Sequence, residues 1–140
     1  MTTPALSIVI PAFNESKRLP IFLDCVIKYC ENTNKIYEII VVDNASTDGS
    51  VDFLKQHHPA IGIVQNTSNG GFAKGYNDGL KHIKADVFCL LNSDVEVTPN
   101  WLQGLSNCFE SDPEVAIAQP KILSVEQPDH FEYAGAAGGF

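Results

Sequence analysis

Apolar residues recur along the chain in two alternating patterns, short runs rich in Ile and Val and longer stretches with helical spacing. The short runs predict strands over residues 6–10, 37–42, 61–64, 87–91 and 115–118. The longer stretches predict helices over residues 19–29, 46–54, 72–83 and 98–109. Helix-capping residues support two of these helices, because residues 46–48 read Ser-Thr-Asp and Thr98 precedes a proline.

A strand followed by a helix, repeated along the chain, predicts an α/β fold with a mostly parallel sheet and helices on both faces. The length of 140 residues fits a single domain, residues 1–140. Beyond Pro120 the pattern fades, and the glycine-rich residues 134–140 contain no predicted element. We therefore expect a truncated fold that leaves part of the sheet uncovered, with either modest stability or self-association through the exposed face.

The composition narrows the classes of protein to which the chain can belong. Hydrophobic residues make up 44% and charged residues 19%, which is enough apolar content for a folded core. The net charge of −8 argues against a nucleic acid partner, since phosphates need clustered Lys and Arg. The sequence contains no transmembrane run and no signal peptide, and its four cysteines are expected to be free thiols in the cytoplasm.

Polar residues follow each of the first four predicted strands. Residues 11–15, 43–49, 66–75 and 92–94 all stand where a parallel sheet binds its ligands, beyond the carboxyl ends of the strands. Asp43 is either a turn-forming residue or the acceptor for the N3–H of a uracil or thymine ring. Asp94 is either a solvated carboxylate or a ligand of a divalent cation that would let an acidic protein hold a diphosphate.

The third loop contains the glycines of the sequence NGGFAKG, residues 69–75. They either build a tight turn or let the backbone and a helix N-terminus approach a ligand. Lys74 is either a surface charge or a contact for the diphosphate, and Phe13 either packs in the core or lines a base pocket. Asn77 is interpreted as a structural residue.

Four familiar nucleotide-binding or signalling classes are disfavoured. The loop after the first strand lacks the glycines of a dinucleotide site, and no P-loop motif occurs. The glycine-rich, basic loop of a sugar nucleotidyltransferase is also missing at that position. A phospho-acceptor regulatory domain would need an acidic pair after the first strand, where Asn14 and Glu15 stand.

The four loops together resemble glycosyltransferase family 2, the inverting group with the GT-A fold. Residues 7–15 (SIVIPAFNE) and 38–50 (EIIVVDNASTDGS) resemble its first two donor loops. Residues 69–77 (NGGFAKGYN) resemble its third loop as found in the rhamnosyltransferase-like branch. Residues 90–95 (LLNSDV) occupy the place of the metal-binding D-x-D motif, with a single Asp. The resemblance covers about residues 6–123, the N-terminal donor-binding portion of the family.

The resemblance implies that the chain binds a UDP- or dTDP-sugar and Mg²⁺ or Mn²⁺. Asp94 is the implied metal ligand, and the implied donor site consists of Pro11, Ala12, Phe13, Asn14, Glu15, Asp43, Asn44, Asn69, Gly71, Phe72, Lys74, Asn92, Ser93 and Asp94.

The reaction implied for the whole enzyme is metal-assisted transfer to an acceptor hydroxyl with inversion. The acceptor would be a glycan or a lipid-linked molecule in cell-surface polysaccharide synthesis, reached from the cytoplasm or the inner face of the membrane. The catalytic base is expected downstream of this chain, because Asp129 and Glu132 come too early. We therefore expect this fragment to bind donor without transferring sugar. The alternative is a module that binds a nucleotide-sugar without catalysis.

Overall fold

The computed structural model describes residues 6–30 and 37–133, so the glycine-rich end lies outside the described residues. The chain divides into two compact units, with the boundary between Val97 and Thr98. Along the chain the first unit contains β1 (Leu6–Ala12), α1 (Leu19–Cys30), β2 (Tyr37–Asp43), α2 (Ser50–His57), β3 (Gly62–Gln65), α3 (Phe72–Leu80) and β4 (Val87–Leu90). The second contains α4 (Trp101–Ser111), β5 (Ile122–Leu123) and β6 (Phe131–Tyr133).

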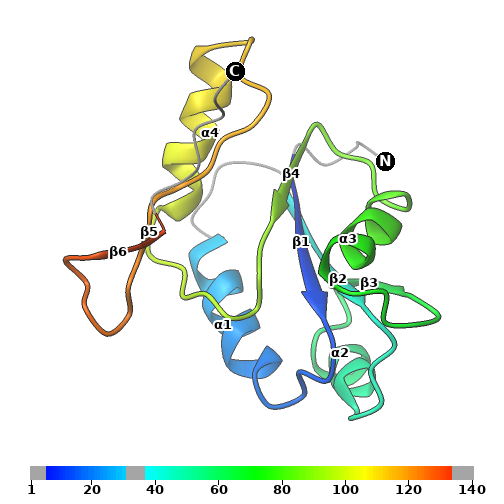
Figure 1. The fold of residues 1–140 in the computed structure, drawn as a ribbon. Helices are drawn as coiled ribbons and strands as arrows, with labels where there is room; N and C mark the ends of the chain where they lie inside the picture. Colours follow the sequence, from blue (N-terminus) through cyan, green and yellow to red (C-terminus); the bar gives the residue numbers. More distant parts are fainter. Residues whose placement is uncertain (1–5, 31–36, 134–140) are drawn as a thin grey trace. The chain divides into compact units, whose positions relative to one another are not determined.

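The sheet of the first unit has the strand order β3-β2-β1-β4, and all its pairs are parallel. The connection from β1 to β2 runs in one direction across the sheet, and the one from β3 to β4 runs in the other. Because such crossovers are right-handed, α1 and α3 must cover opposite faces. Figure 1 shows α1 and α3 on opposite sides of the strands. The predicted α/β fold with helices on both faces is confirmed.

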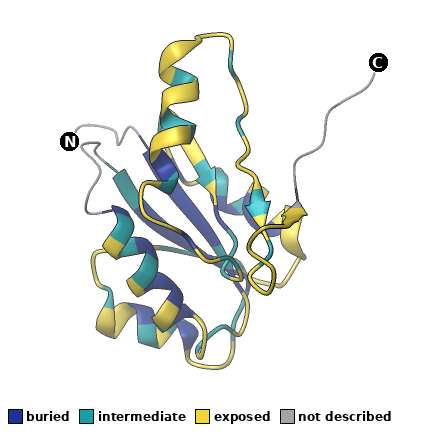
Figure 2. Cartoon of the chain, turned by 90° about the vertical axis from the view of Figure 1, so that its left-hand side faces the viewer, coloured by how far each residue is buried: buried dark blue, intermediate teal, exposed yellow. Residues whose placement is uncertain are grey.

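The core centres on β1, which is flanked by strands on both sides. Ile8, Val9 and Ile10 have no exposed surface. On one face of the sheet, Val9 belongs to a buried cluster with Val42 of β2 and Tyr76 of α3. Because successive side chains of a strand point to opposite faces, Ile8 and Ile10 lie on the other face. Figure 2 shows buried positions concentrated in the central strands and exposed positions on the outer sides of the helices.

The second unit departs from the sequence prediction. Residues 115–118 form no strand, and Ile117 is 89% exposed. A run of four apolar residues has no period that distinguishes a buried strand from an exposed segment, so that prediction was wrong. The strands of this unit are instead the short antiparallel pair β5 and β6. Helix α4 begins at Trp101, two residues beyond the predicted proline start, because Pro99 and Asn100 form a turn in which the Trp101 N–H donates to the carbonyl of Thr98 at 3.2 Å. Asn100 is in a left-handed conformation.

The described part of the chain has no helix long and apolar enough to span a bilayer.

Close packing between α3 and β2 predicts the effect of adding one methyl group. A Cβ at Gly79 would overlap the side chain of Val42, whereas a Cβ at Gly104 of α4 would meet no described atom. Gly79→Ala should therefore lower the free energy of unfolding by about 1–3 kcal/mol. Gly104→Ala should leave it unchanged or raise it by up to about 1 kcal/mol, because alanine favours a helix. Urea unfolding of both variants checks this, and equal stabilities would contradict the described packing.

Candidate functional site

The carboxyl ends of the sheet strands bring the predicted loops together. The strand register pairs Ala12 with Asp43, and Asp43 with Gln65. The backbone N–H of Asn44 donates to the carbonyl of Ala12 at 2.8 Å, and that of Leu91 donates to Val9 at 2.9 Å. The segments after β1, β2 and β4 therefore leave the sheet side by side, as the sequence predicted.

A cleft of about 300 Å³ lies at this edge. Its lining residues are Pro11, Ala12, Phe13, Glu15, Arg18, Asn44, Asn69, Gly71, Phe72, Asn92, Ser93 and Asp94. All of them except Arg18 belong to the predicted donor site. The segments after β1, β2 and β4 and the start of α3 thus contribute to one cavity.

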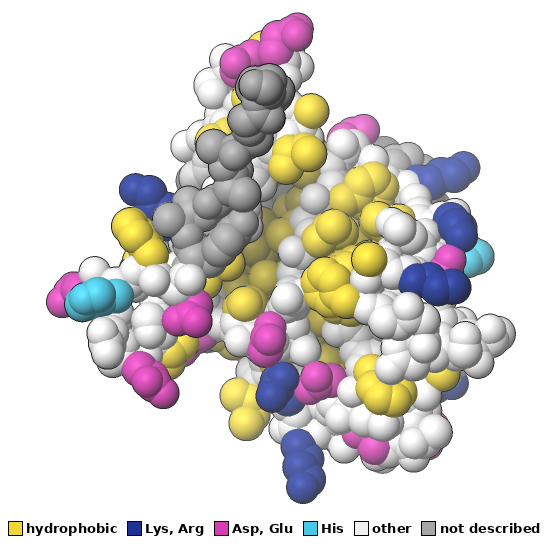
Figure 3. Space-filling view, in the orientation of Figure 1, with side chains coloured by type: hydrophobic (Ala, Val, Ile, Leu, Met, Phe, Trp, Pro, Cys, Tyr) yellow, Lys and Arg dark blue, Asp and Glu magenta, His cyan; other side chains and the backbone are white. Residues whose placement is uncertain are grey.

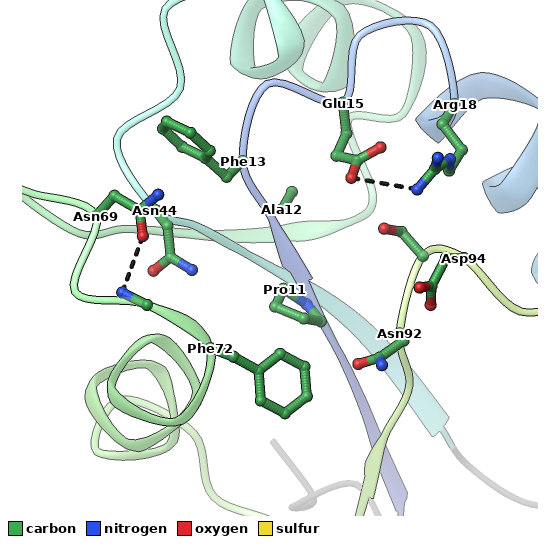
Figure 4. Close-up of a pocket in the computed structure, with 12 residues that line it drawn as sticks. Pro11, Ala12, Phe13, Glu15, Arg18, Asn44, Asn69, Phe72, Asn92 and Asp94 are labelled. Carbon is green, nitrogen blue, oxygen red and sulfur yellow. Dashed lines mark hydrogen bonds and ion pairs between the residues drawn. The ribbon is translucent and has the colours of Figure 1, made fainter. Parts of the chain in front are cut away.

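The cleft has two chemically different sides (Figure 4). Phe13, Asn44 and Asn69 lie on one side of Pro11, and the charged residues Glu15, Arg18 and Asp94 lie on the other. The first side offers an aromatic face and amide groups, whereas the second offers two carboxylates and a guanidinium. A ligand with a flat polar ring at one end and a charged group at the other would match this division.

A network of hydrogen bonds fixes the loop after β1 against the loop after β2. Asn14 donates its backbone N–H to Ser46 Oγ at 2.9 Å, and its Oδ1 accepts from the N–H of Thr47 at 2.8 Å. Asn14 has a φ of 55°, in the left-handed region that asparagine tolerates better than most residues. Asn14 is exposed and does not line the cleft. Its two hydrogen bonds instead position the loop that carries Phe13.

Asp48 forms the second part of this network. Its carboxylate accepts from the backbone N–H of Ser16 at 2.9 Å, from that of Ser50 at 3.1 Å, and from the Ser50 hydroxyl. Desolvation raises the pKa of Asp48, but these hydrogen bonds outweigh it and hold the pKa well below its ordinary value. Ser50 Oγ in turn accepts from the N–H of Glu15 at 3.1 Å, so the network extends to a cleft residue.

Glycines shape the approach of α3 to the cleft. Gly71, the N-cap of α3, has a φ of 84°, and its N–H donates to Asn69 Oδ1 at 2.9 Å. A Cβ at Gly75 would overlap the side-chain amide of Asn44. Asn66 Nδ2 donates to the Oδ1 of Asn44 at 2.7 Å, which fixes the orientation of that amide. The glycines therefore bring the first turn of α3 directly against a cleft residue.

Tyr76 contacts two of the residues that line the cleft, Asn92 and Phe72. Its hydroxyl donates to Asn92 Oδ1 at 3.3 Å, and its ring makes an edge-to-face contact with Phe72 at a centroid distance of 5.0 Å. Burial is the main reason that the pKa of Tyr76 is raised above its ordinary value, with smaller contributions from Cys89 and Asp94. The phenol therefore remains a hydrogen-bond donor to Asn92.

Two further residues of the predicted site do not line the cleft. Asp43 is 1% exposed, and its carboxylate accepts from the N–H of Ser46 at 3.2 and 3.3 Å. Lys74 forms an ion pair with Asp78, which also pairs with Lys81 at 2.7 Å. Hydrogen bonds from these lysines lower the pKa of Asp78 to about 2. Lys74 thus neutralises a carboxylate on its own helix.

The sequence prediction did not include Arg18, which lines the cleft and forms an ion pair with Glu15 at 3.6 Å. The signal for it was present, because Arg18 follows the first predicted loop and stands three residues after Glu15, a spacing that brings side chains together in a helical turn.

The donor set around Asp94 bears on metal binding. Among residues 6–30 and 37–133, no three His, Cys, Asp or Glu side chains come together as a metal site. The cleft offers Asp94, the amide of Asn92 and Ser93, which are all oxygen donors. Oxygen ligands suit Mg²⁺, which usually binds through one or two carboxylates together with substrate phosphates. The residues therefore fit a cation that a diphosphate shares.

The comparison with protein families decides the assignment. Residues 7–133 match the family model of Glycosyl transferase family 2. The chain belongs to glycosyltransferase family 2. The recognised family is therefore confirmed at this level.

Curated relatives of this family 2 chain have a common activity in their names. It is 31% identical over 108 residues to the undecaprenyl-phosphate 4-deoxy-4-formamido-L-arabinose transferase of Edwardsiella ictaluri, an alignment that covers 74% of this chain and 33% of the relative. It is also 31% identical over 123 residues to the transferase of the same name from Sodalis glossinidius, covering 82% and 38%. The chain thus spans between a third and two fifths of these relatives. Their names do not test the rhamnosyltransferase-like branch, which stays a prediction.

Solved structures share the fold of this family 2 chain, and GT-A is confirmed as its class. The mannosyltransferase PcManGT from Pyrobaculum calidifontis, in complex with GDP-Man and Mn²⁺, superposes with a TM-score of 0.66 at 24% identity, covering 82% of this chain and 34% of that one. S. aureus TarS 1-349 in complex with UDP-GlcNAc gives 0.65 at 18%, covering 87% and 41%.

The loop network predicts how stability depends on pH. In the folded chain the pKa of Asp48 lies below its value in the unfolded chain, so its stabilisation is complete above the unfolded pKa of about 4 and is lost as the pH falls through the folded value. Because Asp48 is exposed, we discount this contribution to about 1 kcal/mol. Asp48→Asn should therefore lower the free energy of unfolding by about 1 kcal/mol at pH 7, with a smaller difference below pH 4.

The matched control for this prediction is Asp24→Asn, which removes the same charge from an exposed position on α1. It should change the free energy of unfolding by less than about 0.5 kcal/mol. Denaturant unfolding between pH 3 and pH 7 measures both variants. Equal effects of the two substitutions at pH 7 would show that the hydrogen bonds of Asp48 do not stabilise the loops.

Proposed function

We propose that the cleft binds the nucleotide-diphosphate portion of a UDP- or dTDP-sugar, and that the whole protein transfers the sugar to an acceptor hydroxyl with inversion. The observation that carries this proposal is the convergence of the segments after β1, β2 and β4 and the start of α3 on one cavity. Membership in glycosyltransferase family 2 supports sugar transfer as the reaction. The names of the solved structures support a nucleotide-sugar donor, since PcManGT holds GDP-Man and TarS holds UDP-GlcNAc.

The aromatic and amide side of the cleft is the proposed site of the nucleobase. Phe13 is 44% exposed and lines the cleft, so its ring is accessible to a stacked base. Asn44 also lines this side and is buried, and Asp43, the last residue of β2, precedes it in the chain. The contacts of Asp43 with the Ser46 N–H, at 3.2 and 3.3 Å, lie at the long end of the range for N–H···O hydrogen bonds. We propose that the N3–H of a pyrimidine donates to this carboxylate when the base binds.

The charged side of the cleft is the proposed site of the diphosphate. Asp94 would hold a divalent cation together with phosphate oxygens, and Asn92 and Ser93 would supply neutral oxygen donors nearby. When bound, the cation supplies charge neutralisation for the leaving diphosphate. Residues of this chain orient the donor, whereas the base that removes the proton of the acceptor is expected in the part of the protein that this chain does not span. We therefore expect the 140-residue chain to bind donor without turnover.

The acceptor and the donor sugar belong to the whole protein. The relatives named for undecaprenyl phosphate support a lipid-linked acceptor. With such an acceptor, we propose a role in cell-surface polysaccharide synthesis, reached from the cytoplasm or the inner face of the membrane. The donor is proposed to be a rhamnose or another hexose, after the resemblance of residues 69–77. Transfer from a panel of UDP- and dTDP-sugars by the full-length protein tests this, and binding without any transfer would favour the non-catalytic alternative.

The nucleobase assignment predicts a change in base preference on Asp43→Asn. The asparagine retains one oxygen for the Ser46 N–H, so the fold should persist, but the charged acceptor for N3–H is lost. UDP and dTDP should bind at least tenfold more weakly, because a hydrogen bond to a charged group contributes about 1.5–3 kcal/mol. CDP, whose N3 carries no hydrogen, should not weaken.

Calorimetric titration of UDP, dTDP and CDP into both proteins measures this preference. Thermal unfolding is the control for the fold of the variant. An unchanged dissociation constant for UDP in a folded Asp43→Asn variant would refute the role of Asp43.

The metal assignment predicts the effect of Asp94→Asn. In the unsubstituted chain, Mg²⁺ or Mn²⁺ should strengthen the binding of UDP but not that of uridine, which has no phosphate. In Asp94→Asn, the gain in UDP affinity that the metal provides should be at least tenfold smaller, because the variant lacks the carboxylate of the proposed metal site. The affinity for uridine should be unchanged. Titrations in Mg²⁺ and in EDTA check both statements. Equal affinities of the unsubstituted chain for UDP in the two buffers would contradict them.

A further inference from the structure

The cleft that is proposed to bind a diphosphate is itself lined by more acidic than basic side chains. The titratable side chains that line it are Glu15, Arg18 and Asp94, so its own carboxylates outnumber its cations. Lys74 is paired with Asp78 and lies outside the lining. On the face drawn in Figure 3, basic side chains are interspersed with acidic ones. A diphosphate bound at the charged side would therefore meet two carboxylates, and the cationic side chain among the lining residues is Arg18.

Backbone hydrogen bonds hold Arg18 directly before the first residue of α1. Its N–H donates to the carbonyl of Glu15 at 3.0 Å, and its carbonyl accepts from the N–H of Phe22 at 3.1 Å. The next residue, Leu19, is fully buried and anchors this turn in the core. The backbone of Arg18 is thus held in place by hydrogen bonds. Its side chain is 56% exposed and can change its partner.

The contact that Arg18 makes with Glu15 is weak. Its NH1 lies 3.6 Å from Glu15 Oε1, beyond hydrogen-bond distance, and exposed ion pairs of this kind contribute little to stability. A guanidinium carries five N–H donors in a planar fork that matches phosphate oxygens two at a time. Phosphate is therefore a better partner for Arg18 than the carboxylate it faces, and Figure 4 shows Arg18 on the same side of the cleft as Asp94.

We propose that Arg18 exchanges Glu15 for the diphosphate of the donor and thereby selects diphosphates over nucleosides. This inference rests on the proposed function, because it takes the cleft to be the nucleotide site. Arg18 and the cation at Asp94 then neutralise the diphosphate together. The arginine contribution should be present with and without metal, since the guanidinium is charged at every accessible pH.

The experiment compares the affinities of UDP and uridine for the unsubstituted chain, Arg18→Gln, Arg18→Lys and Lys17→Gln. Lys17 is exposed, adjacent in sequence and absent from the cleft lining, so Lys17→Gln removes the same charge as Arg18→Gln without touching the cleft. Calorimetric titrations in Mg²⁺ and in EDTA give the ratio of the uridine and UDP dissociation constants for each protein. Thermal unfolding checks that each variant is folded.

Arg18→Gln should lower the ratio of the two dissociation constants about tenfold by weakening UDP alone, and the fall should appear in both buffers. The ratio for Arg18→Lys should lie between those for Arg18→Gln and the unsubstituted chain, because lysine provides a point charge without the planar fork of donors. Lys17→Gln should leave the ratio unchanged.

A ratio unaffected by Arg18→Gln would overturn the inference while leaving the proposed function intact. An equal loss of UDP and uridine affinity in Arg18→Gln would also overturn the inference, because it would show that Arg18 has a purely structural role. If the unsubstituted chain bound neither ligand, the proposed function itself would fail, and the inference with it.

Discussion

The parallel pairing of β1 with both of its neighbours is the constraint from which the site follows. β1 pairs with β2 along its whole length and with β4 over residues 6–9, and its central side chains have no exposed surface. A shift of register by one residue would exchange the faces of Ile8, Val9 and Ile10 and disrupt the side-chain packing on both, so this packing fixes the register. With the register fixed, the ends of β1, β2 and β4 can only stand together at one edge. The cleft is a consequence of this packing.

The loops at that edge are held by polar contacts rather than by apolar burial. The amide of Asn14 and the carboxylate of Asp48 satisfy backbone N–H groups across two loops, and Asn66 orients the side chain of Asn44. Backbone donors left unpaired near the core would be costly, so these short polar side chains stabilise the loops and define their shape. The same arrangement leaves Phe13 and Asp94 facing a cavity that is open to a ligand.

The sequence predicted the first unit well because the local signals and the tertiary packing agree there. The apolar runs of β1 and β2 and the helical spacing of α1 each had one physical interpretation, and each forms the predicted element. The run at residues 115–118 had no flanking periodicity to decide between strand and loop, and the prediction of a strand there was wrong.

The site was predictable to the extent that it consists of strand ends. All lining residues except Arg18 were predicted, because parallel strands place their carboxyl ends together. What a sequence pattern could not show was the direction of individual side chains. The carboxylate of Asp43 faces the Ser46 N–H, Lys74 pairs with Asp78 along its helix, and Arg18 extends into the cleft from a neighbouring turn. These directions depend on three-dimensional contacts that sequence spacing does not specify.

The central claim is that the loops at this edge of the sheet form a single nucleotide-diphosphate site. Backbone amide chemical shifts of the ¹⁵N-labelled chain, recorded during a titration with UDP and Mg²⁺, test it most directly. We expect shift changes concentrated in residues 12–18, 43–50, 69–75 and 92–94, all following one dissociation constant. Changes confined to the outer surface of α1 or to residues 98–133, or separate dissociation constants for the four segments, would contradict it.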